Sequence, residues 1–240
     1  MNIREFLKER LDRKSEIGLR LTVNVVVFAL AVWALGGLLD AVLDNDTLVR
    51  WDLVANNWYH THATPAGLRM FSVITEIGSA GVWVVVVLVA LWLWLVRHER
   101  SMTVFWVLGN LGGEVIQYAL KTQVHRARPQ YAAAFLHGHT YSFPSGHTMA
   151  TTIAYLLLAW TLSEVLHLVA GVRVAVYICA LLMCGLIGFS RVYLGVHYPS
   201  DVVGGFTAGL AWVTACASVY HLASSRRALY AAAAAGGEHK

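Results

Sequence analysis

Long runs of apolar residues leave this chain few ways to fold. The clearest runs are 21–39, 79–96 and 202–222. A helix crosses the hydrocarbon layer of a membrane with about 20 mostly apolar residues, and about 17 are tolerated. Backbone groups in hydrocarbon must bond to one another, and these runs lack the period-two alternation of barrel strands, so they favour helices. The sequence therefore predicts an all-α integral membrane protein.

Three further segments are predicted to complete a bundle of six transmembrane helices. They cover 102–120, 148–162 and 174–189. The first carries Asn110, Glu114 and Gln117, and the other two need a few flanking residues to span the membrane. Charged residues make up only 13% of the chain, against about a quarter in soluble domains, which agrees with a bundle in lipid. We expect one bundle domain over 21–222.

The distribution of Lys and Arg predicts the orientation of this bundle. Of the 18 basic residues, 12 fall on the side that holds both termini and six on the other side. Basic residues are retained on the cytoplasmic side of a membrane. Both termini are therefore predicted to be cytoplasmic in a multi-pass protein of the cytoplasmic membrane, with 1–20 and 223–240 as cytoplasmic segments. The loops after the first, third and fifth spans then face the exterior.

Two segments outside the predicted spans, 1–20 and 40–78, contain apolar residues among polar ones. Within 1–20, apolar and basic residues alternate as in a short amphipathic helix on the membrane surface, although a solvated basic tail fits equally. The extracytoplasmic segment 40–78 mixes aromatic and polar residues and suits helices lying in the outer interface. This segment could form a lid or lateral entrance for lipid, or only an aromatic belt at the interface.

Three polar clusters lie at the outer ends of the predicted spans, where an isolated charge needs a reason. The first is KTQVHRARP at 121–129, after the third span. The second is YSFPSGHT at 141–148, before the fourth, and the third is SRVYLGVHYPSD at 190–201, between the fifth and sixth. All three are therefore predicted to meet on one side of the membrane.

The first chemical property of these clusters is positive charge. Lys121, Arg128 and Arg191 supply three permanent cations, and guanidinium groups fit phosphate oxygens in a two-pronged geometry. Ser145 and Gly146 stand just before a helix, so free backbone N–H groups and the positive end of the helix dipole would point at a bound anion. The clusters therefore predict an anion site.

The second property is a pair of imidazoles. His147 and His197 can divide nucleophilic and acid work near neutral pH, since the ordinary pKa of histidine is about 6.5. Asp201 follows His197 by four residues and is placed to hold one ring nitrogen, which leaves the other free to attack. The pattern indicates nucleophilic catalysis on a phosphate.

The clusters match the signature KxxxxxxRP, PSGH and SRxxxxxHxxxD, and the chain resembles the type 2 phosphatidic acid phosphatase superfamily, whose membrane members are lipid phosphate phosphatases. All eleven specified positions are present, and the resemblance covers about 44–222. In size and layout the chain is similar to small bacterial members that dephosphorylate phosphatidylglycerol phosphate, phosphatidate or undecaprenyl diphosphate.

The resemblance implies a role for each motif residue. His197 attacks phosphorus and becomes a phosphohistidine, with Asp201 orienting its ring. His147 protonates the departing lipid oxygen and then activates the water that releases phosphate. The phosphoryl oxygens are bound by Lys121, Arg128, Ser145, Gly146 and Arg191. The resemblance requires no metal or other cofactor, and the sequence contains no cluster of acidic residues suited to magnesium.

Two other residues are predicted to support the site. Ser190 is the first residue of the third cluster. Glu114, Gln117 and Lys121 fall at i, i+3 and i+7, which places them on one helix face toward the bundle. Glu114 would then support Lys121 or shape the headgroup pocket, or else only make a polar contact between helices.

Composition also limits the partners. The basic residues sit in short clusters and form no broad face for nucleic acid, so membrane lipids and a lipid phosphate substrate are the expected partners. Two alternatives to hydrolysis stay open: transfer of the phosphate to another lipid headgroup, and lipid transport or scrambling, suggested by the polar residues within the third span.

Overall fold

The computed structural model describes residues 16–134 and 141–237, and within these ranges the chain is helical and contains no strand. The α-helices are α2 (Glu16–Leu43), α3 (Thr47–His62), α4 (Pro65–Ile77), α5 (Ala80–Leu91), α6 (Arg100–Val124), α7 (Gly146–Val165), α8 (Ala170–Tyr193) and α9 (Pro199–Gly237). A π-helical turn, Trp92–Val96, extends α5, and a 3-10 turn, Gln130–Ala134, follows α6. The all-α prediction is confirmed. The predicted amphipathic helix near the N-terminus lies outside the described residues.

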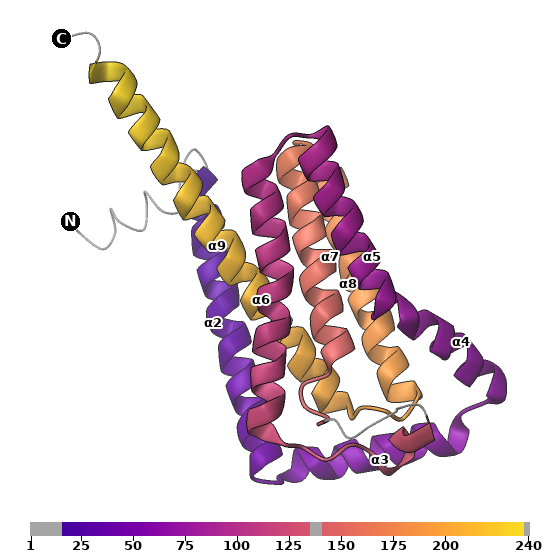
Figure 1. The fold of residues 1–240 in the computed structure, drawn as a ribbon. Helices are drawn as coiled ribbons and strands as arrows, with labels where there is room; N and C mark the ends of the chain where they lie inside the picture. The colour runs from indigo at the N-terminus through magenta and orange to yellow at the C-terminus, as the bar shows by residue number, and fades with distance from the viewer. Residues whose placement is uncertain (1–15, 135–140, 238–240) are drawn as a thin grey trace.

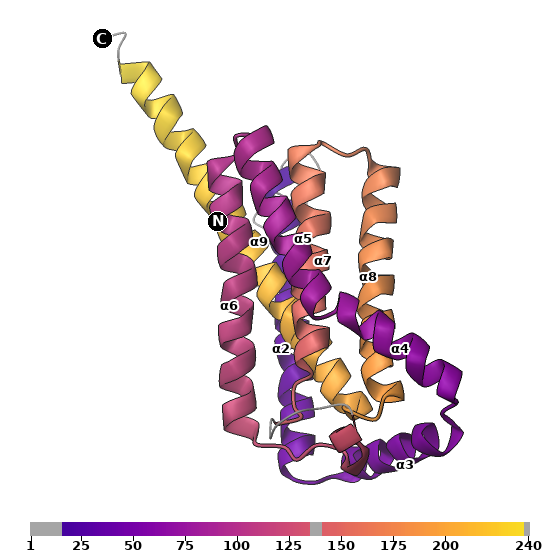
Figure 2. The ribbon, with the colours of Figure 1, turned by 45° about the vertical axis from the view of Figure 1, so that its right-hand side comes forward.

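Within the described chain, five helical segments are long and apolar enough to cross a membrane. They are Gly18–Leu43, Pro65–Val96, Gly146–Val165, Ala170–Tyr193 and Pro199–Ser225. They contain five of the six spans predicted from sequence. The exception is α6, whose polar residues lower its hydropathy even though it has 25 residues and packs against α7 and α9 within the bundle (Figures 1 and 2).

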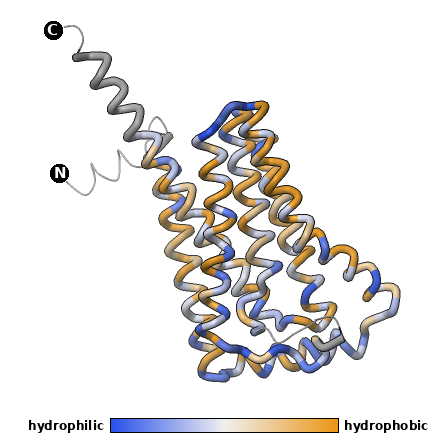
Figure 3. Tube along the Cα trace, in the orientation of Figure 1, coloured by the Kyte–Doolittle hydropathy of each residue, from blue (hydrophilic) through white to orange (hydrophobic). Residues whose placement is uncertain are grey.

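The surface of the bundle is apolar along most of its length. Figure 3 shows hydrophobic residues along the middle of the helices and hydrophilic residues at both ends. Helix α2, which packs along α9, exposes large side chains such as Trp33 (78% exposed), Leu30 and Phe28. Such a surface is stable in lipid and not in water, because apolar contact with water is unfavourable.

Two tryptophans, one fully and one partly buried, join the central helices. Trp106 on α6 is fully buried, and its indole N–H donates to the carbonyl of Val86 on α5 at 2.8 Å. Trp212 on α9 donates in the same way to the carbonyl of Gly109 on α6 at 2.7 Å. Each indole therefore satisfies its polar group while its ring fills the core.

Helix α3 connects the first two of the five apolar segments and runs across one end of the bundle, and α4 forms the first part of the second segment (Figure 1). Asp46 caps α3, while Thr64 caps α4 and is followed by Pro65 at the first helical position. On α3, Asp52 and Asn56 are buried one turn apart. A helix that buries polar side chains on its inner face is held to the bundle by more than apolar packing.

Helix α9 brings the third motif against the second. Its first turn contains Asp201, and a Cβ atom at Gly205 would lie 2.6 Å from the carbonyl oxygen of Ser145. Only glycine permits this approach to a backbone atom. At its other end α9 remains helical to Gly237, beyond residue 222, where the sequence places the end of the last span.

Candidate active site

The three motif clusters meet around one cavity of about 420 Å3. Seven of the site residues predicted from sequence line this cavity: Glu114, Lys121, Arg128, Gly146, His147, Arg191 and His197. Gln117, Ala150 and Trp83 complete much of the wall. The cavity therefore brings α5, α6, α7 and α8 together with the two loops that carry Arg128 and His197.

Three cations form part of this wall. Arg191 comes from the last turn of α8 and is only 5% exposed. One of its terminal nitrogens donates to Thr75 Oγ1 at 2.8 Å, whereas its Nε has no hydrogen-bond partner in the described chain. Lys121 lies in the last turn of α6, and Arg128 lies four residues beyond that helix. Fixed cations with a spare buried donor suit a phosphoryl group.

The hydrogen bonds of His197 identify the tautomer of its ring. Its Nδ1 lies 3.4 Å from Asp201 Oδ2, and Arg128 approaches its Nε2 at 3.2 Å. Arginine carries only donors, so Nε2 must be the accepting nitrogen. The proton then sits on Nδ1, which donates to Asp201. The lone pair of Nε2 is consequently directed at Arg128, a residue that lines the cavity, and not at Asp201.

Burial controls the charge of His197. The side chain is 1% exposed, and this desolvation lowers its pKa to about 4, although the hydrogen bond and the charge of Asp201 act in the opposite direction. At neutral pH the imidazole is therefore neutral, which is the form that can attack phosphorus.

Asp201 is held from several directions. Its Oδ2 accepts the backbone N–H of Tyr198 at 2.9 Å and the hydroxyl of Ser142, and its Oδ1 accepts Arg126 at 2.6 Å. The carboxylate is completely buried. A buried charge is tolerated when it is paired and hydrogen-bonded in this way.

His147 stands in the first turn of α7, with its ring at the cavity and partly exposed. Gly146 precedes it, and a Cβ atom at Gly146 would lie 2.8 Å from the side-chain nitrogen of Gln117. The glycine therefore lets α6 approach the start of α7. The first backbone N–H groups of α7 have no partner within their own helix and are available to an anion.

Two of the predicted residues, Ser145 and Ser190, do not line the cavity. The backbone N–H of Ser145 donates to the carbonyl of Asp201 at 2.9 Å, so it is not free for a phosphate, and the side chain is completely buried. Its hydroxyl accepts from Thr148 instead. The hydroxyl of Ser190 donates to the carbonyl of Ile187 in its own helix. Neither serine is among the residues that line the cavity.

Sequence reasoning missed the residues behind His197. Arg126 forms ion pairs with Asp201 at 2.6 Å and with Asp52 at 2.8 Å. Asp52 also accepts the backbone N–H of Ser200 at 3.0 Å and the hydroxyl of the same serine. Arg126 occupies an unspecified position of the first motif, and Asp52 lies far from every motif. The one available signal was the pair Asp52 and Asn56, polar at i and i+4 in an aromatic segment.

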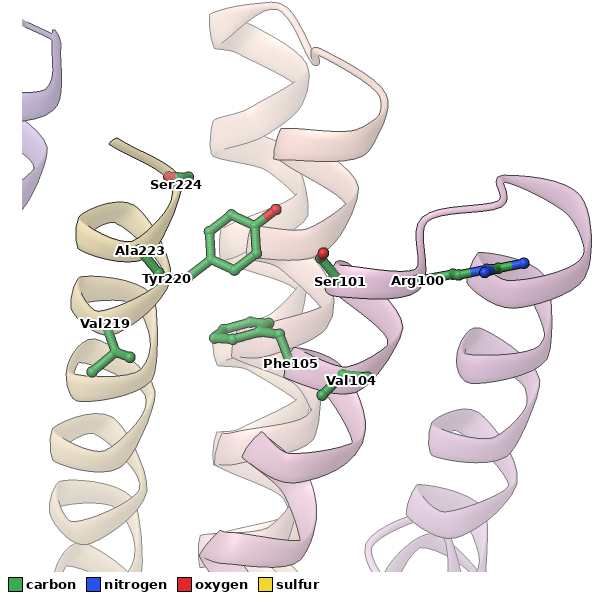
Figure 4. Close-up of a pocket in the computed structure, with 8 residues that line it drawn as sticks. All are labelled: Arg100, Ser101, Val104, Phe105, Val219, Tyr220, Ala223 and Ser224. Carbon is green, nitrogen blue, oxygen red and sulfur yellow. The ribbon is translucent and has the colours of Figure 1, made fainter. Parts of the chain in front are cut away.

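A second cavity, of about 370 Å3, lies between α6 and α9 at the other end of the bundle. Its lining includes Phe105, Val104, Val219 and Tyr220. Figure 4 shows that the side chain of Arg100 points away from Phe105 and Tyr220. Among the described residues, Arg100 is the one basic residue in its lining and no histidine lines it, so this cavity lacks the paired imidazoles and the cation cluster of the first one.

Comparisons with known proteins agree with this geometry. The family model described as the PAP2 superfamily matches residues 103–224, which contain all three motifs and all seven of the cavity residues named first. The chain belongs to the PAP2 superfamily. The match runs from α6 to α9, so the family region holds the reactive groups and leaves out α2 to α5.

Relatives in the superfamily are named as lipid phosphatases. The chain is 41% identical to phosphatidylglycerophosphatase B of Bacillus subtilis over 96 residues, which is 40% of this chain and 47% of that protein. It is 27% identical to undecaprenyl-diphosphatase of Sulfolobus acidocaldarius over 161 residues, 65% of this chain and 70% of that protein. The chain thus spans about half the length of the first of these relatives.

A solved structure extends the likeness to most of the fold. The crystal structure of a transmembrane PAP2-type phosphatidylglycerolphosphate phosphatase from Bacillus subtilis superposes with a TM-score of 0.71 at 26% identity. The superposition covers 82% of this chain and 94% of the other. The chain therefore shares a membrane PAP2 fold, including helices outside the region matched by the family model.

Proposed function

We propose that this protein is a metal-independent membrane phosphatase that hydrolyses a lipid phosphate or diphosphate through a phosphohistidine on His197. The observation that carries the proposal is the cavity in which a neutral, oriented imidazole faces Arg128 and Arg191 and shares the wall with His147. Nucleophile, anion site and a second imidazole are the groups that phosphoryl transfer through a covalent intermediate requires.

The first step forms a bond from His197 Nε2 to phosphorus and breaks the bond from phosphorus to the lipid oxygen. His147 gives a proton to that leaving oxygen, so the lipid departs as an alcohol or a monophosphate. Asp201 balances the positive charge that the phosphorylated ring acquires, through the Nδ1 proton. Lys121, Arg128, Arg191 and the N-terminus of α7 stabilise the charge on the phosphoryl oxygens.

The second step returns the enzyme to its starting state. His147, now neutral, removes a proton from water as the water oxygen attacks phosphorus. The bond between phosphorus and Nε2 breaks, inorganic phosphate leaves, and the lone pair of Nε2 is restored. His147 ends the step protonated, ready for the next leaving group, so protons and charge balance over one turnover.

The membrane arrangement is part of the proposal. Helix α6 serves as a sixth span, because 25 residues at about 1.5 Å per residue exceed the roughly 30 Å of hydrocarbon. Its polar residues Glu114 and Gln117 face the cavity and not the lipid. Arg20 pairs with Glu164 and Arg97 donates to the carbonyl of Val165, both in the last turn of α7 and so opposite the end that carries His147. The proposal therefore has the site on the extracytoplasmic side and both termini in the cytoplasm.

Phosphatidylglycerol phosphate is the first substrate to test. Both the 41% identical relative and the superposed structure carry names that refer to phosphatidylglycerophosphate phosphatase activity. Undecaprenyl diphosphate is the second substrate to test, because the relative with the longer match is named an undecaprenyl-diphosphatase. Phosphatidate is the third. In all three, a phosphoryl group is attached to an apolar anchor.

The decisive experiment compares purified wild-type protein with His197→Ala on these three lipids in detergent, with phosphate release as the readout. We expect release by the wild type, no detectable release by His197→Ala, and unchanged release by His62→Ala, which removes an exposed histidine of α3. Release that persists in His197→Ala would remove His197 as the nucleophile. Phosphate recovered on an added lipid acceptor would identify a phosphotransferase, and lipid transport retained in His197→Ala would identify a transporter.

A further inference from the structure

The segment 40–78 reaches the site through two buried polar side chains that belong to no motif. Thr75 on α4 is 5% exposed and accepts a hydrogen bond from Arg191 at 2.8 Å. Asp52 on α3 is 2% exposed and pairs with Arg126 at 2.8 Å. No residue of α3 is among those that line the cavity. Asp52 therefore cannot act on a substrate directly and acts through its neighbours.

Arg126 connects Asp52 to the carboxylate behind His197. One terminal nitrogen of the guanidinium contacts Asp201 Oδ1 at 2.6 Å, and the other contacts Asp52 Oδ2 at 2.8 Å. The ring of Tyr198 packs against the guanidinium, with 4.4 Å between the Arg126 Cζ atom and the ring centroid. The side chain is 9% exposed. Each branch of the planar guanidinium thus holds one carboxylate in a fixed direction.

The charges in this group explain why two carboxylates are present. A single ion pair between Arg126 and Asp201 would be neutral, and Asp201 would have little charge left for the ring of His197. Burial opposes the charged form of Arg126, yet Asp201 and Asp52 together raise its pKa above the ordinary value. The three side chains therefore carry a net charge of minus one. Asp52 offsets Arg126, and the negative charge of Asp201 remains available to the imidazole.

We propose that Asp52 is a positioning residue that acts through Arg126: it balances the guanidinium so that Arg126 can fix Asp201 without neutralising it. The hydrogen bonds from Ser200 to Asp52, one from its backbone and one from its hydroxyl, hold Asp52 against the first turn of α9, where Asp201 lies. The segment 40–78 thereby contributes to the chemical step and not only to the surface of the bundle. This inference rests on the proposed phosphohistidine mechanism.

The test is a charge-balance cycle with three variants: Asp52→Asn, Arg126→Gln and the double variant. The formal charge on residues 52, 126 and 201 is minus one in the wild type, zero in Asp52→Asn, minus two in Arg126→Gln and again minus one in the double variant. We expect each single variant to lower kcat about 10- to 100-fold. KM should stay within about twofold, because the phosphate-binding residues are untouched. The double variant should have a higher kcat than either single variant.

This recovery separates charge balance from a structural role. Loss of packing or of hydrogen bonds accumulates, so a structural role predicts that the double variant is the least active of the three. A kcat in the double variant equal to or below that of the single variants would overturn the proposal, as would a wild-type kcat in Asp52→Asn. If Asp52→Asn does not purify as a monodisperse protein, the comparison of Arg126→Gln with the double variant decides alone.

A matched control and the parent reaction complete the experiment. Asp44→Asn removes the same charge from an exposed position just before α3, and we expect wild-type kcat and KM. Absence of phosphate release by the wild type from every lipid tested would sink the proposed function itself. Release by the wild type, none by His197→Ala and full release by Asp52→Asn would sink only the role of Asp52.

Discussion

The active site has two halves that differ in how firmly the protein holds them. In the closed half, His197, Asp201, Ser142 and Asp52 are at most 2% exposed, and Arg126 ties the carboxylates together. The open half consists of Lys121, Glu114, Gln117, Gly146 and His147, which line the cavity and are partly exposed. His197, the proposed nucleophile, is therefore fixed by the fold, whereas His147, the proposed acid and base, stands where a substrate can reach it.

This difference has a physical reason. An attacking nitrogen must keep one orientation and one tautomer, which requires a buried carboxylate and a second cation to hold that carboxylate. Proton donation to different lipids requires access, so its residue cannot be buried in the same way. Changes in the closed half should therefore reduce both activity and stability, and changes in the open half should reduce activity alone.

Among variants that keep both motif histidines, the largest expected effect follows from Asp201→Asn, which breaks the closed half. Loss of the carboxylate that orients a catalytic histidine costs roughly 10^4-fold in kcat in a comparable triad. Removal of one partner of a buried ion pair also destabilises a protein by about 3–5 kcal/mol. We expect both losses together, measured as phosphate release and as the unfolding temperature in detergent.

Asp44→Asn is the control for Asp201→Asn and should change neither quantity. If Asp201→Asn lost activity but kept the wild-type unfolding temperature, the carboxylate would not be the structural centre of the closed half.

The second prediction concerns the open half. His147→Gln should lower kcat by about 10^2- to 10^4-fold, because it removes general acid and base catalysis. The unfolding temperature should stay within about 1 °C of the wild type, since no hydrogen bond from the described chain holds the ring and the change leaves no buried charge unpaired.

His62→Gln, on an exposed helix end, serves as its control and should retain full activity. A loss of stability in His147→Gln as large as that in Asp201→Asn would contradict the division of the site into two halves.

The motif residues of both halves could be predicted from the sequence, whereas the residues that hold Asp201 from behind could not. The motifs specify Lys121, Arg128, Arg191, His147 and His197, and all five line one cavity. Each is a polar group at the end of an apolar helix, where its cost in lipid makes it conspicuous. The helices themselves follow from apolar runs, so the all-α fold was predictable. Composition alone does not identify α6 as a membrane span, because it carries too many polar residues.

The remainder depends on contacts between distant parts of the chain. Asp52 meets Arg126 across 74 residues and Ser200 across 148. No local sequence pattern predicts such a pairing, and an aspartate in an expected interfacial helix is ordinarily predicted to face solvent. The partner of the backbone N–H of Ser145 could not be predicted for the same reason, because it is the carbonyl of Asp201 on another helix.

The third prediction uses pH to test burial in the closed half. The pKa of His197 falls to about 4 in the folded protein, against an ordinary value of 6.5. Below pH 6.5, His197 is protonated in the unfolded chain but not in the folded chain. Its contribution to the free energy of unfolding is therefore complete above pH 6.5 and declines as the pH falls toward 4. The loss should be on the order of 2–3 kcal/mol.

The readout is the unfolding temperature between pH 7.5 and pH 4.5 in the wild type, His197→Gln and His62→Gln. His197→Gln should show a shallower decline, while His62→Gln should follow the wild type. Parallel declines in all three proteins would mean that His197 is not a buried neutral imidazole.

The fourth prediction concerns the boundary between the halves. Arg128 donates to the carbonyl of Val196 at 2.9 Å and approaches His197 Nε2 at 3.2 Å. Arg128→Lys keeps the charge but loses the planar fork, so kcat/KM should fall about tenfold, mainly through KM. Phosphate release at varied lipid concentration measures it. An unchanged kcat/KM would show that only the charge at this position matters.

The smallest expected effect concerns Glu114, the one carboxylate in the open half. It lines the cavity on the same face of α6 as Lys121, but no ion pair joins the two in the described chain. The idea that Glu114 supports Lys121 is therefore weaker than the idea that it contacts the lipid headgroup.

Phosphatidylglycerol phosphate has a free glycerol hydroxyl that could donate to Glu114, whereas a polyprenyl diphosphate has none. Glu114→Gln should lower kcat/KM for the first lipid relative to the second by about two- to tenfold, the value of one net hydrogen bond. An equal loss of kcat/KM on both lipids would indicate that Glu114 supports Lys121. No loss on either lipid would indicate that Glu114 only makes a polar contact between helices.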